Sequence, residues 1–522
     1  MPSVSHSNDS SFKHFIFSTQ RNKIYLALAA IAIIIQFFMF KYFYPFPNFI
    51  HADSFVYLDA AYNNTTFSLH PIGYSKFLRL FSVFSTSAVV LTALQYLLIQ
   101  GSALGFIFTI FYLYRPGKVI ESLLITAVVL SPISLHLANL ISADGLFMAL
   151  SFIWLTLLLW ILHRPTPYLS TWHAIILLLA FSVRYNALYY PLISILVYVL
   201  SPQKPWHKIS GITAGLLLIG GFIFFTSEQY KLFTGKQIFS PFSGWQMVNN
   251  ALYAYRYVDS AKRKPAPLKF QELDKEVRNY FDTSRNLLTH PLEQLEASTA
   301  YIWTPTSPLR AYVAKQYSLD KSIQDSLTRK YKRWASAGPL LGKYGSWLIR
   351  QYPREFIHHY LWPNVIKYYT PPTEFLDTYN MGFGTIDPIA QTWFGFKSNK
   401  VTTEFRNPRA SSLEFYPILT AIVNGFFICC ILGFSFMIGF KQQTDLSRLV
   451  ILAGSLWLLN FGFSIFASPI ALRFQVFTTL TFLSISLILF EHIYNTSSEK
   501  ERIKDAVQPL NRRESILNST VL

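Results

Sequence analysis

The sequence predicts an all-α polytopic membrane protein with about ten transmembrane helices and one mainly helical extracytoplasmic domain. Of its 522 residues, 52% are hydrophobic and only 14% are charged. Long uncharged runs recur along most of the chain, and Lys and Arg gather in alternate loops between them. Together these three features are typical of a chain that crosses a bilayer repeatedly.

The apolar runs give ten candidate spans. The first is too long for a secretory signal and has no small-residue cleavage site after it. The fifth and sixth are short enough to form a shallow or re-entrant pair, and because they come as a pair the orientation of later runs does not depend on them. The two cysteines, Cys429 and Cys430, are adjacent inside one run, which indicates packing residues rather than a disulfide framework or a metal site. The ten runs are 24–40, 88–112, 120–135, 146–161, 172–183, 187–200, 209–225, 417–440, 449–467 and 474–490.

The distribution of Lys and Arg predicts the orientation. With the N-terminus inside, fifteen Lys or Arg residues fall in cytoplasmic segments and only a few in the short outer loops. Short cytoplasmic loops retain positive charge, whereas long domains cross a membrane regardless of charge and are left out of the comparison. Both termini are therefore expected in the cytoplasm.

The runs divide the chain into four parts. These are an N-terminal transmembrane module (1–226), an extracytoplasmic domain (227–416), C-terminal transmembrane helices (417–494) and a cytoplasmic tail (495–522). Residues 227–416 carry 25 Lys or Arg against 16 Asp or Glu and are too many for a linker. Apolar residues at helical spacing over 270–288 and 319–327 predict small amphipathic helices. Residues 344–369 mix aromatic and basic side chains, which predicts either a helix among lipid headgroups or an aromatic core inside the domain.

Carboxylates are scarce on the predicted outer face. Outside the long domain they are Asp53, Asp59 and Asp144. Asp53 and Asp144 each lie beside the end of an apolar run, where a base would meet a lipid-linked substrate. For both, the alternative is an N-cap that accepts hydrogen bonds from first-turn amides. Glu121 and Glu491 lie near cytoplasmic run ends, where snorkelling to the interface explains them without a function.

Cations on the outer face indicate an anionic partner. Arg184 and Arg473 each stand alone at the outer edge of a run, against the charge bias. Lys76 and Arg79 are three residues apart, so both can point one way from a helix toward a phosphate. Anchoring to lipid headgroups is the alternative for all four. His70, before a Pro and Gly break in the chain, is a weaker candidate that could equally cap the turn.

Four stretches carry a resemblance to a known family. The chain resembles the GT-C membrane glycosyltransferases, in particular the bacterial group that includes the aminoarabinose and protein O-mannosyl transferases, over residues 1–225 and 449–490. The first loop lacks the second acid that many relatives have beside the first Asp, and Phe474 stands where Tyr is usual, so metal use and the acceptor stay open. The stretches are Asp53 with Tyr57; His70, Pro71, Gly73 and Tyr74; Ser142, Asp144, Leu146 and Phe147; and Leu472, Arg473 and Phe474.

The resemblance implies a transferase that moves a sugar, with inversion, from a polyprenyl-phosphate-linked donor to a glycan, lipid or protein acceptor. The location it implies is the bacterial inner membrane, among membrane lipids. A divalent metal is compatible with these residues but not required by them, and no metal ligand is assigned. The implied site residues are Asp53 (base) and Asp144 (orienting acceptor or base) as catalytic residues, Arg473, Arg184, Lys76 and Arg79 as donor-phosphate-binding residues, and Tyr57, His70 and Tyr74 as substrate-binding residues.

Two other classes fit parts of the sequence. A secondary transporter usually has ionisable groups and broken helices near the bilayer midplane, whereas the predicted span centres here contain none; a lipid flippase escapes this argument in part. A ligase or polymerase of lipid-linked glycans would share the membrane chemistry, and the net nine positive charges of residues 227–416 would suit an anionic glycan or lipid headgroups. Nucleic-acid binding is not supported, because the basic surplus faces outward among interface aromatics.

Overall fold

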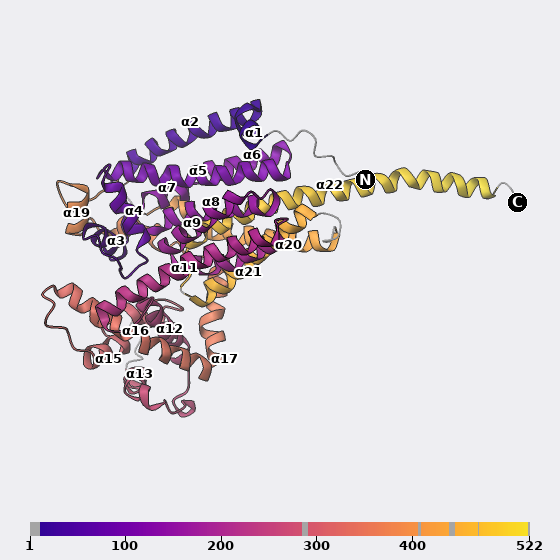
Figure 1. The fold of residues 1–522 in the computed structure, drawn as a ribbon. Coiled ribbons are helices and arrows are strands. Elements are labelled where there is room, and N and C mark those ends of the chain that lie inside the picture. Colours follow the sequence, from indigo (N-terminus) through magenta and orange to yellow (C-terminus); the bar gives the residue numbers. More distant parts are fainter. Residues whose placement is uncertain (1–10, 284–290, 406–408, 438–443, 468, 520–522) are drawn as a thin grey trace.

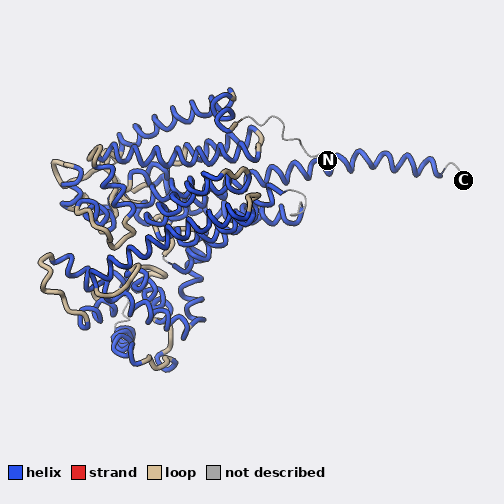
Figure 2. The backbone as a smooth tube through the Cα atoms, viewed as in Figure 1, coloured by secondary structure: helices blue, strands red, loops and turns tan. Residues whose placement is uncertain are grey.

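The described part of the chain is helical throughout. The computed structural model describes residues 11–283, 291–405, 409–437, 444–467 and 469–519, and Figure 2 shows helices joined by loops over all of them. Extended pairing within these ranges is limited to three isolated bridges. The all-α class predicted from composition is confirmed.

Eight helical segments of the described chain are long and apolar enough to cross a membrane. They match the first four, the seventh and the last three predicted runs; residues 438–440 of the eighth run lie outside the described residues. The predicted fifth and sixth runs correspond to two shorter apolar helices, α9 (Pro167–Val183) and α10 (Tyr190–Leu200). The long segments are built from α2 (Gln20–Phe43), α5 (Ala88–Tyr114), α6 (Lys118–Val129) with α7 (Pro132–Asn139), α8 (Ala143–His163), α11 (Pro205–Thr234), α20 (Tyr416–Met437), α21 (Thr444–Ala467) and α22 (Leu472–Ser519).

The long helices form a bundle with two distinct ends (Figure 1). The short helix α1 (Phe12–Ser18) and the part of α22 that extends beyond the bundle lie at one end. The short helices α3 (Asp53–Tyr62), α4 (Gly73–Ser82) and α19 (Pro388–Phe394) lie at the opposite end. α22 packs on both α6 and α8, so the N-terminal and C-terminal spans share one core.

A second hydrophobic core lies beside the bundle, in the module labelled α12 to α17 in Figure 1. This core draws its buried residues from Tyr230 to Tyr360, which is less than the predicted domain of 227–416. Buried residues from Leu376 to Tyr416 belong to the core of the bundle instead. The helices after α11 are α12 (Pro241–Tyr255), α13 (Gln271–Thr283), α14 (Ala300–Trp303), α15 (Pro308–Gln316), α16 (Ser326–Gln351), α17 (Pro353–Phe356) and α18 (Trp362–Tyr369).

Glycines bring the two main helices of this module into backbone contact. A Cβ built on Gly244 of α12 would overlap the carbonyl of Gly338 on α16, and one built on Gly345 would come within 2.6 Å of the Cα of Val248. Packing this close leaves no room for any side chain larger than hydrogen. The α12–α16 pair is therefore the rigid centre of the module.

Of the two helices expected in the long segment, the structure contains one. The helix expected over 319–327 is wrong, because α16 begins only at Ser326, where Asp325 accepts a hydrogen bond from the Thr328 amide. Upstream, the Asp320 carboxylate accepts from the Ser322 amide at 3.0 Å and forms a local turn in place of a helix. The helix expected over 270–288 is present as α13 up to Thr283, and residues 284–288 lie outside the described residues.

The first part of the stretch 344–369 forms an aromatic core inside the domain, which was one of its two predicted arrangements. Tyr344, Tyr352, Phe356 and Tyr360 are buried members of the second core, so this part is an aromatic core and not a helix lying among headgroups. Trp362 stays largely exposed.

The two acids assigned to the other end of the bundle both bond to neighbouring helices. The Glu121 side chain is 2% exposed and forms an ion pair with Arg21 at 2.9 Å. Glu491 accepts a hydrogen bond from the Gly117 amide at 2.9 Å. Snorkelling is therefore wrong for Glu121, whereas the Glu491 bond lies at the surface, where snorkelling is compatible with it.

Candidate functional site

Asp144 is the buried centre of the candidate site. Ser142, not Asp144, caps α8: its hydroxyl accepts from the Asp144 amide at 3.2 Å. The same hydroxyl donates to the Asp144 carboxylate at 2.6 Å. The capping alternative for Asp144 is therefore wrong, and its carboxylate, whose side chain is 1% exposed, is available to other partners.

Two arginines from distant segments are those partners. Arg184, at the end of α9, and Arg473, at the start of α22, each form an ion pair with Asp144, one to each carboxylate oxygen. The Arg473 distance is 2.9 Å. Both guanidinium carbons lie over the ring of Phe474, 4.2 and 4.3 Å from its centroid. The arginines expected singly at two span edges thus form one fixed pair.

Asp53 lies beside this pair. Its side chain is 30% exposed, and one carboxylate oxygen is 3.3 Å from Nε2 of His70. Burial raises the pKa of Asp53, but His70, Arg473 and Arg184 together lower it more, so the pKa lies below its ordinary value. Asp53 is therefore an ionised carboxylate that solvent or a substrate can reach.

The backbone before Asp53 is strained. α3 begins at Asp53 and its N-cap is Ala52, whose φ of 76° and ψ of −62° are those of a γ-turn that alanine rarely adopts. Asp53 is thus not the N-cap, and the capping alternative is wrong for this residue too. Strain of this kind persists where the surrounding structure fixes it, which is common at functional sites.

Hydrogen bonds between two loops explain why Asp53 and Asp144 belong to one site. The Ser54 hydroxyl donates to the carbonyl of Ile141 at 2.6 Å. The Ile141 amide donates in turn to the carbonyl of Asn48 at 2.9 Å. These bonds fasten the start of α3 to the start of α8.

Glu374 is a member of the site that the sequence did not suggest. Its carboxylate is 3.9 Å from Nε of Arg473, and burial raises its pKa although Arg473 acts against this. Its φ of 47° is also in the left-handed region. Pro372, two residues earlier, accepts a hydrogen bond from the Leu472 amide, which holds this loop to the start of α22. Glu374 lies in the long segment among many other charges, and only the Pro-Pro pair before it distinguishes it in the sequence.

The predicted substrate-binding residues pack around His70. The His70 ring stacks on Tyr57 with centroids 4.8 Å apart, and Tyr57 meets Tyr74 edge to face. Tyr74 is fully buried and its hydroxyl donates to Gln95, so it fixes α4 against α5. Contact of these three residues with a substrate stays a prediction.

Gly73 sets how closely α4 approaches Arg184. A Cβ on Gly73 would lie 2.7 Å from the carbonyl oxygen of Ser182, two residues before Arg184. We expect Gly73→Ala to push α4 away, with a loss of about 1–3 kcal/mol in stability and at least a tenfold loss of activity. Thermal unfolding and turnover of the purified variant check this. Gly101→Ala is the matched control, because a Cβ there meets nothing within 4 Å; an equal loss in both variants would contradict the role of Gly73.

Lys76 and Arg79 do not join the arginine pair. Nζ of Lys76 donates to the side-chain oxygen of Asn64 at 2.8 Å, and Arg79 is exposed. Within the described ranges neither forms an ion pair with Asp53 or Asp144. A phosphate-binding role for them stays a prediction.

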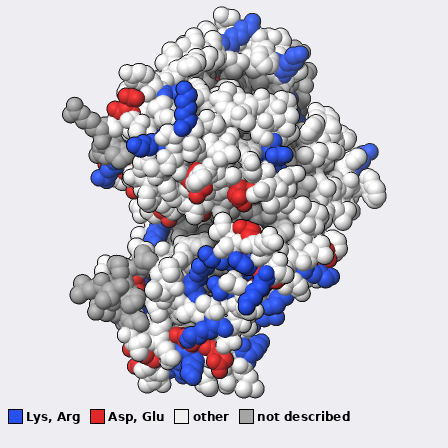
Figure 3. Space-filling view, turned by 90° about the vertical axis from the view of Figure 1, so that its left-hand side faces the viewer, with Lys and Arg blue, Asp and Glu red and all other residues white. Residues whose placement is uncertain are grey.

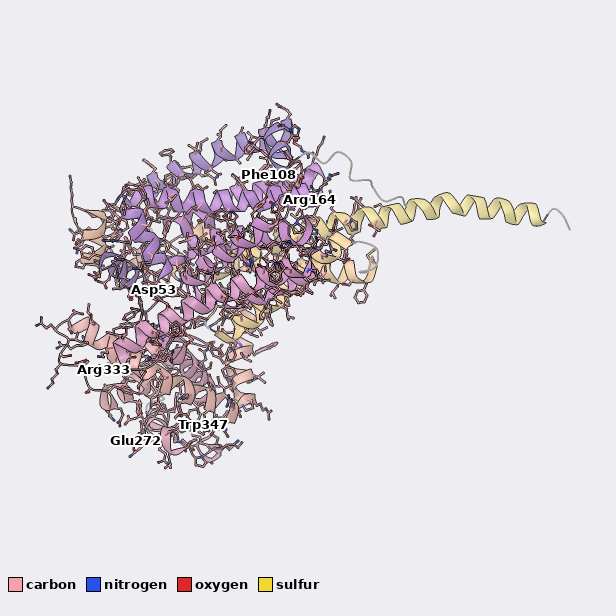
Figure 4. All side chains as sticks on the ribbon, in the orientation of Figure 1. Asp53, Phe108, Arg164, Glu272, Arg333 and Trp347 are labelled. Atoms are coloured by element: carbon pink, nitrogen blue, oxygen red, sulfur yellow. The ribbon has the colours of Figure 1, made fainter. Side chains whose placement is uncertain are left out.

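The surface around the site is charged. Figure 4 places Asp53 where the end of the bundle faces the α12–α16 module. Figure 3 looks onto this end and shows Asp and Glu side chains along the boundary of the two parts, with Lys and Arg gathered below them.

A separate open groove of about 660 Å³ lies between Pro45, Val89 and Phe396, and none of its lining residues belongs to the site. Over the described residues, no group of three or more His, Cys, Asp or Glu side chains is placed to hold a metal ion.

Comparison with known protein families, with curated proteins and with solved structures finds no match for this chain.

Proposed function

We propose that this protein is a membrane glycosyltransferase that moves a sugar from a polyprenyl-phosphate donor to an acceptor on the extracytoplasmic side. The observation that carries the proposal is the Arg184–Asp144–Arg473 cluster next to the partly exposed carboxylate of Asp53. Fixed cations beside an available base are what displacement of a phosphate by a hydroxyl requires.

The arginine pair suits the leaving phosphate. Asp144 holds both guanidinium groups in place, and Glu374 also lies 3.9 Å from Nε of Arg473. Among the described residues, Arg184 uses one Nη for Asp144, and its other N–H groups meet no acceptor. Planar guanidinium groups bind phosphate oxygens in pairs, and burial beside Phe474 strengthens such contacts.

The acidic side of the site suits the acceptor. In the proposed reaction the acceptor oxygen bonds to the anomeric carbon from the face opposite the phosphate, and its proton goes to the Asp53–His70 pair. The bond from carbon to phosphate oxygen breaks, and its electrons leave with the polyprenyl phosphate. Direct displacement inverts the anomeric centre and needs no covalent enzyme intermediate.

Chemical change of the donor separates this proposal from its rivals. The full chain is reconstituted in vesicles with polyprenyl-phosphate sugars and acceptor material extracted from the source membranes, and lipids are followed by mass spectrometry. We expect free polyprenyl phosphate to appear and the sugar to move to another molecule. Movement of intact donor between leaflets with no loss of sugar would instead establish a flippase.

Arg473 should matter most for the donor. Arg473→Ala removes a charge-assisted contact worth about 1.5–3 kcal/mol, so we expect a roughly tenfold to hundredfold rise in donor KM and little change in acceptor KM. Steady-state kinetics with each substrate varied in turn measures both. Equal losses for donor and acceptor would contradict a phosphate role, and Arg79→Ala in the same assay tests the prediction for the surface cations.

A further inference from the structure

The His70 side chain is positioned as more than a neighbour of Asp53. Its Nε2 is buried and lies 3.3 Å from an oxygen of the Asp53 carboxylate, which is an ion-pair distance but not a hydrogen bond of good geometry, and Asp53 is the acid that this nitrogen faces. The ring is held flat against Tyr57, and its side chain is 17% exposed. An imidazole that carries its proton on the nitrogen nearest a carboxylate has its lone pair on the other nitrogen, and this is the arrangement of a general base and its orienting acid.

The loop that carries His70 is fixed from two sides. Gly73 packs against the backbone of Ser182, as described above. On the other side, the Tyr230 hydroxyl donates to the carbonyl of Ser68 at 2.7 Å, and its oxygen lies 2.6 Å from the hydroxyl of Tyr331 on α16. The module and the bundle therefore both hold the imidazole in place, which a base needs and an incidental surface histidine does not.

The charges around Asp53 disfavour it as the proton acceptor. Arg473 and Arg184 stabilise its ionised form, and a carboxylate stabilised in this way binds a proton weakly. The groups that face His70 or its partner are Asp53 and Tyr57 on α3, Tyr74 on α4, Arg184 after α9, Arg473 on α22 and Glu374 beside it.

We propose that Nδ1 of His70 takes the proton of the attacking hydroxyl, and that Asp53 acts through Nε2 to orient the imidazole and stabilise its cation. This inference rests on the proposed transfer reaction. As the acceptor oxygen bonds to the anomeric carbon, its O–H bond breaks and the proton moves to Nδ1. The electron pair of the sugar–phosphate bond leaves with the phosphate, and the imidazolium later returns its proton to water.

The pH dependence of turnover tests the assignment in the reconstituted full chain with extracted polyprenyl-phosphate sugars. We expect the wild-type rate to fall as the pH drops below neutrality, because a protonated imidazole has no lone pair to take the hydroxyl proton. If Asp53 itself were the base, the fall in the pH–rate profile would lie below pH 3.8, because the pKa of Asp53 is lowered from that ordinary value. We expect His70→Gln to lose about a hundredfold or more of the rate and to lose the limb near neutrality.

Chemical rescue distinguishes a base from a structural residue. We expect added imidazole to restore part of the rate of His70→Ala and none of the rate of Asp53→Asn. His51→Gln is the matched control, because His51 stacks on Phe383 and bonds to Asn380 instead of Asp53. Failure of rescue, or a His70→Gln variant with an unchanged pH profile, would return the role of base to Asp53.

A second measurement needs no turnover. Nuclear magnetic resonance of the full chain labelled in histidine, with the His70 signal identified by its loss in His70→Gln, reports which nitrogen carries the proton. We expect the Nε2–H form in the wild type and a changed form in Asp53→Asn. An Nδ1–H form in the wild type would overturn the inference, whereas absence of sugar transfer with an Nε2–H form would overturn only the proposed function.

Discussion

Asp144→Asn is expected to cause the largest loss of stability of any single change at the site. The Asp144 side chain is 1% exposed, and the substitution leaves Arg184 and Arg473 buried side by side with no anion between them. Removing one partner of a buried ion pair costs about 3–5 kcal/mol, because the remaining charge stays desolvated. Thermal unfolding of the detergent-solubilised protein measures the effect.

Asp445→Asn supplies the comparison at the other end of the bundle. Asp445 pairs with His163 at 3.3 Å, but its side chain is 71% exposed, so solvent already screens the interaction and we expect a small shift in Tm. A double variant adds a sharper check. Arg473→Gln should lower the stability much less in the Asp144→Asn background than in the wild type, because in that background it removes a charge that has already lost Asp144 as its partner. Additive effects would show that Asp144 does not hold the arginines together.

Asp53→Asn is expected to have the largest effect on activity. It keeps the size of the side chain but removes the negative charge that faces Nε2 of His70. Loss of a well-placed base or of its charged partner lowers turnover by about a hundredfold to ten-thousandfold. Because Asp53 is partly exposed, expression and thermal stability should change little. Turnover and Tm of the same preparation separate the two effects.

Asp59→Asn is the matched control for this variant. Asp59 lies on the same helix, six residues on, is exposed, and accepts a hydrogen bond from Asn63 at 3.0 Å. We expect it to keep wild-type turnover. Retained turnover in Asp53→Asn, or an equal loss in Asp59→Asn, would remove Asp53 from the reaction.

Local patterns predicted most of the fold and part of the site. Eight of the ten apolar runs are long apolar helices, because the length and hydropathy of a run are written in consecutive residues. The same patterns singled out Asp53, Asp144, Arg184 and Arg473, which stand out against an apolar background. They failed over 319–327, where turn-forming Asp320 and Asp325 override an apolar spacing of helical period.

The partners within the site were beyond such patterns. Asp144 and Arg473 are 329 positions apart, and only the packing of α8 and α22 brings them to 2.9 Å. Glu374 reaches Arg473 because a hydrogen bond between Leu472 and Pro372 joins two segments a hundred residues apart.

By itself the sequence determined that this protein is a helical membrane protein. It also determined where the long spans lie and which charged residues stand at the ends of apolar runs. Hydropathy and charge act on each segment separately, so a linear reading captures them. The tertiary structure alone decided that Asp144 clamps two arginines, that Glu374 joins them, and that His70 stands between Asp53 and Tyr57. Those pairings depend on the close approach of segments at glycines and loop hydrogen bonds, which no local pattern encodes.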